Sequence, residues 1–153
     1  MDNVYTHSNI SFAISTTAQN SDLTLLQFAG LTYTSVGSVG SIPERGINTN
    51  MLSYDTVNTL VSKKAKGITD AGTGTLECAR NSSDAGQIAM TAAGQPDNFD
   101  SYAFRIVKQD GTVEYARGLV SGPNYPGGRN EDFDVANYTI AYQQAPLEDP
   151  ASV

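Results

Sequence analysis

The chain is poor in the side chains from which catalytic and metal sites are usually built. Its 153 residues include one histidine, one cysteine and no tryptophan. A single cysteine excludes an internal disulfide, and without a second histidine or cysteine no zinc-type ligand cluster can form. The same shortage leaves no histidine free to complete a Ser–His–Asp triad. We therefore expect no enzyme, no bound cofactor and no resident metal ion.

The few reactive side chains have ordinary structural interpretations. His7 lies in residues 1–9, a predicted N-terminal arm, so an exposed or packed imidazole is favoured over a general base. Cys78 falls on the core side of a predicted strand and is interpreted as a small buried hydrophobe. An acidic group lies at Glu131, Asp132 and Asp134. Its spacing is not that of an EF-hand loop, so a solvated loop is favoured over a metal site.

Basic residues are also scarce. The chain has nine lysines and arginines and 16 acidic residues, which give a formal charge of −7. This balance disfavours a protein that grips nucleic acid through its phosphates, but not one past which DNA moves without sticking. The sequence has no apolar run of about 20 residues, and its start lacks the pattern of a secretory signal. We expect one soluble domain, residues 1–153, made in a reducing cytoplasm.

What the sequence does contain is a β pattern with many turns. Residues 10–16 alternate between apolar and small polar side chains, and residues 22–37 continue the β pattern with a break at Gly30. A short strand follows at residues 74–80, with Leu76 and Cys78 on its core side. The last predicted strand covers residues 135–144, and its core face carries Ala136, Tyr138, Ile140 and Tyr142.

The remaining segments are a helix, a long loop and a tail. Residues 81–94 form the one predicted helix, in which Asp84 and Gln87 resemble a capping box and Ser82 or Ser83 is the competing N-cap. Its predicted buried face is Ala85, Ile88, Ala89, Ala92 and Ala93. Residues 41–66 keep no periodicity and are expected to be a functional loop ending in a lysine cluster. The tail, residues 145–153, is expected to be flexible. The predicted class is therefore α+β, mainly β.

The clearest stretch is FRIVKQDGTVEYARGLVSG, residues 104–122, which predicts a β-hairpin. Asp110-Gly111 favours a tight type I′ turn. This turn would place Phe104 opposite Arg117, Ile106 opposite Tyr115 and Val107 opposite Glu114. The predicted core face is Tyr102, Phe104, Ile106, Val113, Tyr115 and Leu119. The predicted mixed face is Arg105, Val107, Glu114 and Ala116, with Arg105 and Glu114 close enough to pair.

The order of these segments resembles the major tail tube protein of long non-contractile-tailed, lambda-like bacteriophages. The resemblance runs from SVGSVGSIPERG through MLSYDTVNTLVSKKAKGITDAG to the strand TLECAR and the helix SDAGQIAMTAAG. It is strongest in the hairpin YAFRIVKQDGTVEYARGLVSG, whose second strand carries Tyr115, Arg117 and Gly118. No segment is diagnostic alone, and the specificity comes from their order.

The resemblance implies two packed antiparallel sheets, sandwich-like or barrel-like, with one short flanking helix. It implies six copies in a ring, and rings stacked on a tape-measure protein into a tube that conducts DNA without binding it. A tail-tip initiator and a terminator would be partners, in a virion tail assembled in the host cytoplasm. Candidate lumen or subunit-interface residues are Glu77, Arg105, Glu114 and Arg117. Candidate inter-ring residues of the long loop are Glu44, Arg45, Tyr54, Asp55, Lys63 and Lys64.

Two alternatives stay open. The same tube fold occurs in gene-transfer particles, tail-derived bacteriocins and secretion tubes, which the sequence separates poorly. The other alternative is a monomeric or low-oligomer β-sandwich binding module, for example one that binds carbohydrate. Eight tyrosines and five phenylalanines without a tryptophan disfavour a sugar platform, and several of the tyrosines fall on predicted core faces.

Overall fold

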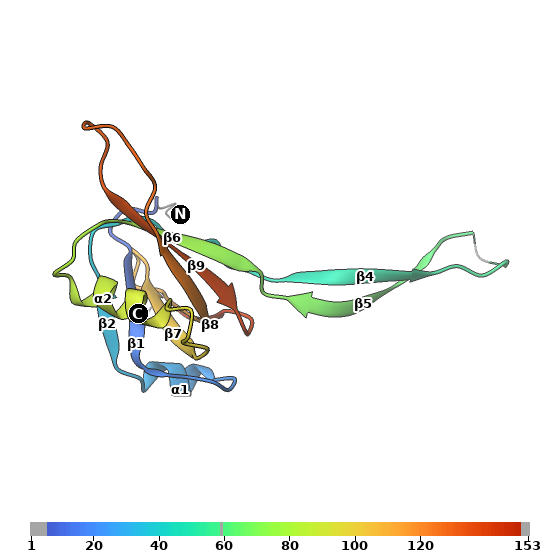
Figure 1. Ribbon diagram of the computed structural model, residues 1–153. Helices are drawn as coiled ribbons and strands as arrows, with labels where there is room; N and C mark the ends of the chain where they lie inside the picture. The colour runs from blue at the N-terminus through green and yellow to red at the C-terminus, as the bar shows by residue number, and fades with distance from the viewer. Residues whose placement is uncertain (1–5, 59, 151–153) are drawn as a thin grey trace.

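A computed structural model describes residues 6–58 and 60–150 (Figure 1). The fold is mainly β, as predicted, and within these described residues it contains two short helices rather than one. In chain order the elements are β1 (Ser11–Ala18), α1 (Leu25–Ala29), β2 (Tyr33–Val36), β3 (Val39–Ser41), β4 (Asn48–Tyr54), β5 (Lys63–Asp70), β6 (Thr73–Ala79), α2 (Ala85–Ala93), β7 (Ser101–Val107), β8 (Val113–Asn124), β9 (Val135–Tyr142) and β10 (Leu147–Asp149).

Eight strands form one antiparallel sheet. Its order is β2-β1-β7-β8-β9-β6-β3, with β10 paired to the first residues of β8. The end strands β2 and β3 are separated in the chain only by Gly37 and Ser38, so the chain joins the two ends of the sheet. The sheet is therefore barrel-like, and one curved sheet takes the place of the two packed sheets that the resemblance implied. β4 and β5 form a separate two-stranded sheet.

The main core lies inside this curved sheet, under α2. One cluster joins side chains from both ends of the strand order, including Phe12 of β1, Val36 of β2 and Leu76 of β6. The rings of Phe12 and Phe104 stack with their centroids 5.6 Å apart. The tyrosines at 138 and 142 and the cysteine at 78 belong to the same cluster, which confirms the predicted core faces of β6 and β9.

Helix α2 begins and ends where its capping residues predict. Asp84 accepts a hydrogen bond from the Gln87 backbone N–H, and Gly94 follows the last turn. The predicted buried face is only partly right: Ala93 is buried and Ala89 packs partly against the core, but α2 otherwise buries Gly86, Gln87 and Met90, while Ile88 is exposed. The Gln87 amide donates to the carbonyls of residues 37 and 79 at 3.0 and 2.8 Å, so it ties α2 to both ends of the sheet instead of closing a capping box.

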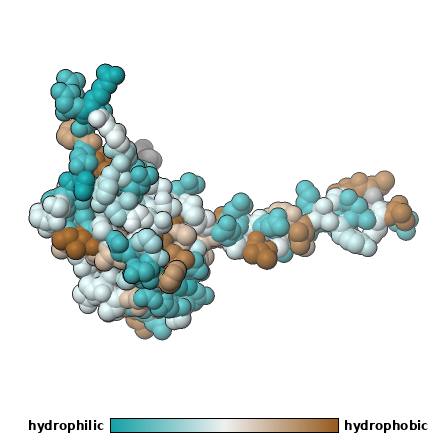
Figure 2. Space-filling view, in the orientation of Figure 1, coloured by the Kyte–Doolittle hydropathy of each residue, from teal (hydrophilic) through white to brown (hydrophobic). Residues whose placement is uncertain are grey.

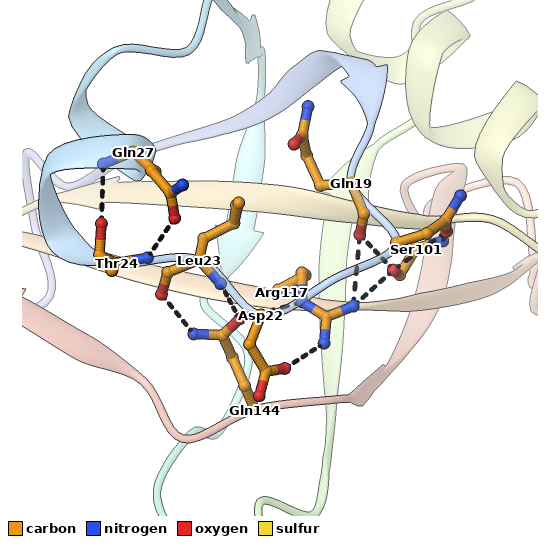
Figure 3. Close-up of polar contacts among 9 residues, drawn as sticks. Gln19, Asp22, Leu23, Thr24, Gln27, Ser101, Arg117 and Gln144 are labelled. Carbon is orange, nitrogen blue, oxygen red and sulfur yellow. Dashed lines mark hydrogen bonds and ion pairs between the residues drawn. The ribbon is translucent and has the colours of Figure 1, made fainter.

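Helix α1 occupies a segment that was predicted to be a strand. The Thr24 hydroxyl accepts from the Gln27 N–H at 3.3 Å, and the Gln27 side chain accepts from the Thr24 N–H at 2.9 Å (Figure 3). This reciprocal capping box starts a helix of only five residues. Phe28 of α1 packs on the outer side of the sheet, with its ring 5.3 Å from that of Tyr115.

The β7–β8 hairpin forms, but its predicted register is wrong by one residue. Phe104 lies opposite Ala116, and Ile106 lies opposite Glu114. The turn is a three-residue loop, since Lys108 N–H donates to the carbonyl of residue 112 at 2.8 Å and Gly111 has a φ of 92°. A shift of one residue moves alternate side chains to the other face, so Val113 and Tyr115 lie on the outer side of the sheet.

Three other predictions concern the ends of the chain and its long loop. The tail was expected to be flexible, yet Leu147–Asp149 form β10 against β8. The predicted loop 41–66 is largely a β-hairpin, made of β4 and β5. Of the predicted arm, residues 1–5 lie outside the described residues, and residues 6–9 precede β1.

Candidate assembly surface

The most unusual feature is a long β-ribbon that leaves the body of the protein (Figure 1). We define the ribbon as residues 47–70, which comprise β4, β5 and the tip between them. The strands pair from Asn48 opposite Asp70 to Tyr54 opposite Lys63, with one register shift between Thr49 and Met51. Two strands alone are marginally stable in water, because neither face is packed on a core. The ribbon therefore needs support from outside its own hairpin.

Apolar side chains gather on this ribbon. Figure 2 shows brown patches along the projection and at its tip. Eight of the 14 large exposed hydrophobic residues in the described part of the chain belong to it: Ile47, Met51, Leu52, Tyr54, Val57, Leu60, Val61 and Ile68. Scattered exposed hydrophobic residues are ordinary, but a concentration of this kind marks an interaction surface.

The ribbon is also the basic part of an acidic protein. It holds three lysines and two aspartates, for a formal charge of +1, while the rest of the chain holds six basic and 14 acidic residues, for −8. Strand alternation places Leu52, Tyr54 and Lys63 on one face of the ribbon. The other face carries Lys64 and Lys66. Among the described residues, no carboxylate lies within ion-pair distance of these lysines.

The root of the ribbon is held by an ion cluster. Arg45, just before the ribbon, pairs with Glu114 near the start of β8, and the Lys108 ammonium lies 2.6 Å from the same carboxylate. Burial alone would raise the pKa of Glu114, but the hydrogen bonds from Arg45 and Lys108 outweigh it and hold the pKa below its ordinary value of 4.5. On the other strand the chain leaves the ribbon through Gly72, whose φ is 77°.

The predicted inter-ring residues all lie on the ribbon or at its root. Tyr54, Lys63 and Lys64 are exposed on its strands, and Asp55 begins its tip. Glu44 and Arg45 stand at its root, where they line a cavity of about 320 Å³ together with Asn48 and Asp70. The sequence missed the strands because both faces of the ribbon are exposed, so no apolar alternation marks them.

The structure separates the four predicted lumen or interface residues. Glu77 is exposed on β6, and Glu114 is at the ribbon root. Arg105 lies with its guanidinium 4.8 Å from the centre of the Tyr33 ring, so it does not form the predicted pair with Glu114. Its Nε is buried without a hydrogen-bond acceptor in the described part of the chain.

Arg117 is buried, with 6% of its surface exposed, and it connects three separate segments (Figure 3). It donates to the Ser101 hydroxyl at 2.8 Å, to the Gln144 side chain at 3.0 Å and to the Asp22 carboxylate at 2.7 Å. A further bond reaches the carbonyl of Gln19 at 3.3 Å. Arg117 thus fastens the segment before α1 and the segment after β9 to the sheet, a role within one chain.

The side chains that could bind a metal ion are not gathered into a cluster in the described part of the chain. No group of three or more histidine, cysteine, aspartate or glutamate side chains is placed to hold a metal ion there. Burial raises the pKa of the Cys78 thiol to about 11, so at neutral pH it is a protonated core side chain, as its strand position predicted. Among the described residues, neither helix has the length and hydropathy that crossing a bilayer requires.

Comparison with known proteins gives structural matches only. No family model matches the chain, and no curated protein matches its sequence. One match is a chain of the sheath/tube terminator of an extracellular contractile injection system, PVC, in its extended state. It has a TM-score of 0.68 and 9% identity, and the alignment covers 97% of this chain and 99% of that one.

A second match is a chain of the anti-feeding prophage baseplate, with a TM-score of 0.67 and 8% identity. That alignment covers 96% of this chain and 97% of the other. The fold is shared over essentially the whole chain. At this identity the likeness shows the fold alone.

Proposed function

We propose that this chain is a ring-forming structural subunit of a tail-like particle, and that the ribbon is its contact to neighbouring copies. The observation that carries the proposal is the two-stranded ribbon with eight exposed large hydrophobic residues. The shared fold supports it, because both matched chains come from multi-protein assemblies, and one of those is described as six-fold symmetrised.

Burial of the ribbon against another copy gives a sufficient driving force. Fully burying a leucine or valine side chain contributes about 1.5–3 kcal/mol. Burying Leu60 and Val61 at the tip would therefore contribute about 3–6 kcal/mol before the cost of ordering. The same contact would supply the packed face that a two-stranded ribbon lacks in the isolated chain.

In its finer form, the proposal has six copies closing each ring and the rings stacking into a tube. A tape-measure protein, a tail-tip initiator and a terminator would be its partners, with assembly in the bacterial cytoplasm. The matched structures favour a tail-derived injection particle over the lambda-like DNA-conducting tail that the sequence resemblance implied. Within this proposal Glu77 is the lumen candidate, because its side chain is exposed on the sheet.

The test is sedimentation and electron microscopy of the purified chain over a concentration series. We expect rings or hollow tubes of uniform bore. Replacing the tip residues (Val57→Ser with Leu60→Ser and Val61→Ser) should abolish them while the fold is retained. The matched control Leu26→Ser removes an equally exposed leucine from α1 and should still assemble. A wild-type chain that stays monomeric at millimolar concentration contradicts the proposal.

A further inference from the structure

We infer that the ribbon of one copy docks on the β8–β9 loop of the next copy. This inference rests on the proposed self-assembly and names the surface that receives the ribbon. We call residues 125–134 the acidic loop; they connect β8 to β9 and are all exposed. Of its aromatic side chains, Phe133 is 87% exposed, although loop phenylalanines usually fold back onto the protein.

The acidic loop has a defined shape. The Asp132 carboxylate accepts from the Arg129 N–H at 2.8 Å, and the Asp132 N–H donates to the Arg129 carbonyl at 3.0 Å. At the foot of the loop, the Arg80 guanidinium lies 3.9 Å from the centre of the Tyr125 ring and 3.7 Å from the Asp134 carboxylate. These contacts brace the loop, while the Phe133 side chain stays largely exposed. The aromatic ring is thus presented to an outside partner.

Charge makes the ribbon and the acidic loop complementary. The ribbon offers Lys64 and Lys66 on one face and Lys63 on the other, and the acidic loop offers Glu131, Asp132 and Asp134 against a single cation, Arg129. Glu131 has no ion-pair partner in the described part of the chain. Most cations outside the ribbon are already engaged with an acid or a ring, namely Arg45, Arg80, Arg105, Lys108 and Arg117. The ribbon lysines are thus suited to a second copy's carboxylates, and opposite charges direct encounter and register.

A hollow beside the acidic loop suits the apolar tip of the ribbon. It has a volume of about 230 Å³ and is lined by Arg80, Tyr125, the exposed Ile88 of α2 and Tyr138 of β9, among others. A valine or leucine from the tip of a neighbouring ribbon would find apolar walls there. The lysines of that ribbon would lie outside the hollow, toward the acidic loop.

The topology places the two surfaces at opposite ends of the same strands. The acidic loop enters β9 at Val135. Near the other end of β9, Ala141 lies opposite Thr73, which follows the last residue of the ribbon, Asp70, by three positions. The eight residues of β9 span roughly 25 Å at about 3.3 Å per residue. Each copy can therefore give one contact and receive another, the head-to-tail arrangement that builds rings or stacks.

A second turn with acidic residues and an exposed aromatic ring serves as a control for the composition of the acidic loop. A second exposed phenylalanine, Phe99, is 83% exposed between Asp97 and Asp100, much as Phe133 is among its acids. This turn leads into β7 at Ser101, which lies in the same row of the sheet as Leu119 and Ala141. It therefore sits at the ribbon end of the sheet. If acidic residues and an exposed aromatic ring were sufficient, both turns would bind the ribbon, whereas we expect only the acidic loop to bind it.

The test compares these two turns. Glu131→Lys with Phe133→Ser should raise the concentration at which assembly begins by about tenfold or more, whereas Asp97→Lys with Phe99→Ser should leave it unchanged. Combining Glu131→Lys with Lys64→Glu should recover part of the loss, because the opposite charges are restored in exchanged positions. Assembly that survives the acidic-loop change while the wild type forms rings overturns this inference and leaves the proposed function standing.

Disulfide cross-linking tests the same contact independently. Val61→Cys with Phe133→Cys should give a ladder of disulfide-linked oligomers under oxidising conditions, because Cys78 is buried and does not compete. Val61→Cys with Phe99→Cys should give none. The reverse pattern, or a linked dimer that does not extend, overturns the head-to-tail contact. A wild-type chain that forms no assembly at all counts against the proposed function itself.

Discussion

Arg45 is paired with Glu114, which lies 69 residues further along the chain. The first residue stands at the root of the ribbon and the second at the start of β8, so this pair connects a projecting element to the sheet. Lys108, from the β7–β8 turn, approaches the same carboxylate. The ion cluster therefore ties the root of the ribbon to the sheet.

Neutralising Glu114 should loosen the direction of the ribbon. Glu114→Gln keeps the shape of the side chain but removes the charge that holds both cations. Distances between spin labels at Ser53→Cys and Thr139→Cys should show a broader distribution in this variant. Glu77→Gln, an exposed acid with no ion pair in the described part of the chain, is the control and should leave the distribution unchanged. An equally narrow distribution in both variants contradicts the role of the cluster.

The same contact should depend on pH. The pKa of Glu114 is lowered in the folded chain, so its stabilising contribution is fully present above its ordinary value of 4.5 and is lost as pH falls through the lower folded value. The label distances should therefore broaden in acid below about pH 4.5 in the wild type. Glu114→Gln should show a broad distribution already at pH 7, with little further change at this site. A wild-type distribution that stays narrow through this range would be inconsistent with the ion cluster.

Removing Arg117 should cost much more stability than removing its acidic partner. Arg117→Met removes charged hydrogen bonds to the Ser101 hydroxyl and the Gln144 side chain, each worth about 1.5–3 kcal/mol, although both groups keep a backbone partner. Asp22 is 79% exposed, and an exposed ion pair is worth under about 1 kcal/mol, so Asp22→Asn should be mild. Urea denaturation of both variants measures the difference, and similar losses would show that the ion pair dominates.

The contact of α2 with the sheet depends on a residue without a side chain. A Cβ on Gly86 would lie 2.1 Å from the Ser35 carbonyl oxygen, so Gly86→Ala must push the helix away from β2. We expect it to lower the free energy of unfolding by about 1–3 kcal/mol. Gly30, after α1, has its nearest atoms at 3.6 Å, so Gly30→Ala should cause no loss. Thermal unfolding compares the two, and equal effects would contradict the close packing of α2.

The sequence predicted best the elements that bury one face. β6 and β9 alternate cleanly because one side of each packs on the core, and the ends of α2 follow from Asp84 and Gly94. The buried face of α2 is predicted only in part, because Gly86 and Gln87 face the sheet through close approach and hydrogen bonds that apolar periodicity does not reveal. Tertiary contact decided that orientation.

The errors have local physical causes. Five residues are too few for a helical period, so α1 looked like a strand despite its capping box. The predicted register of the β7–β8 hairpin is wrong by one residue because Asp110-Gly111 suits a two-residue turn, whereas Gly111 closes a three-residue loop. The ribbon is exposed on both faces, so its sequence shows no period of two. The expectation that this segment contacts other subunits came from the resemblance to tail tube proteins, and it remains a proposal.

Amide hydrogen exchange on the ribbon, in the monomer and in the assembled form, tests the central claim most directly. Two isolated strands exchange quickly in the monomer, because their hydrogen bonds are shielded on neither face. If the ribbon is the contact between copies, the amides of residues 47–70 should become strongly protected on assembly, together with those of residues 125–134. Assemblies in which the ribbon exchanges as fast as in the monomer would contradict the account.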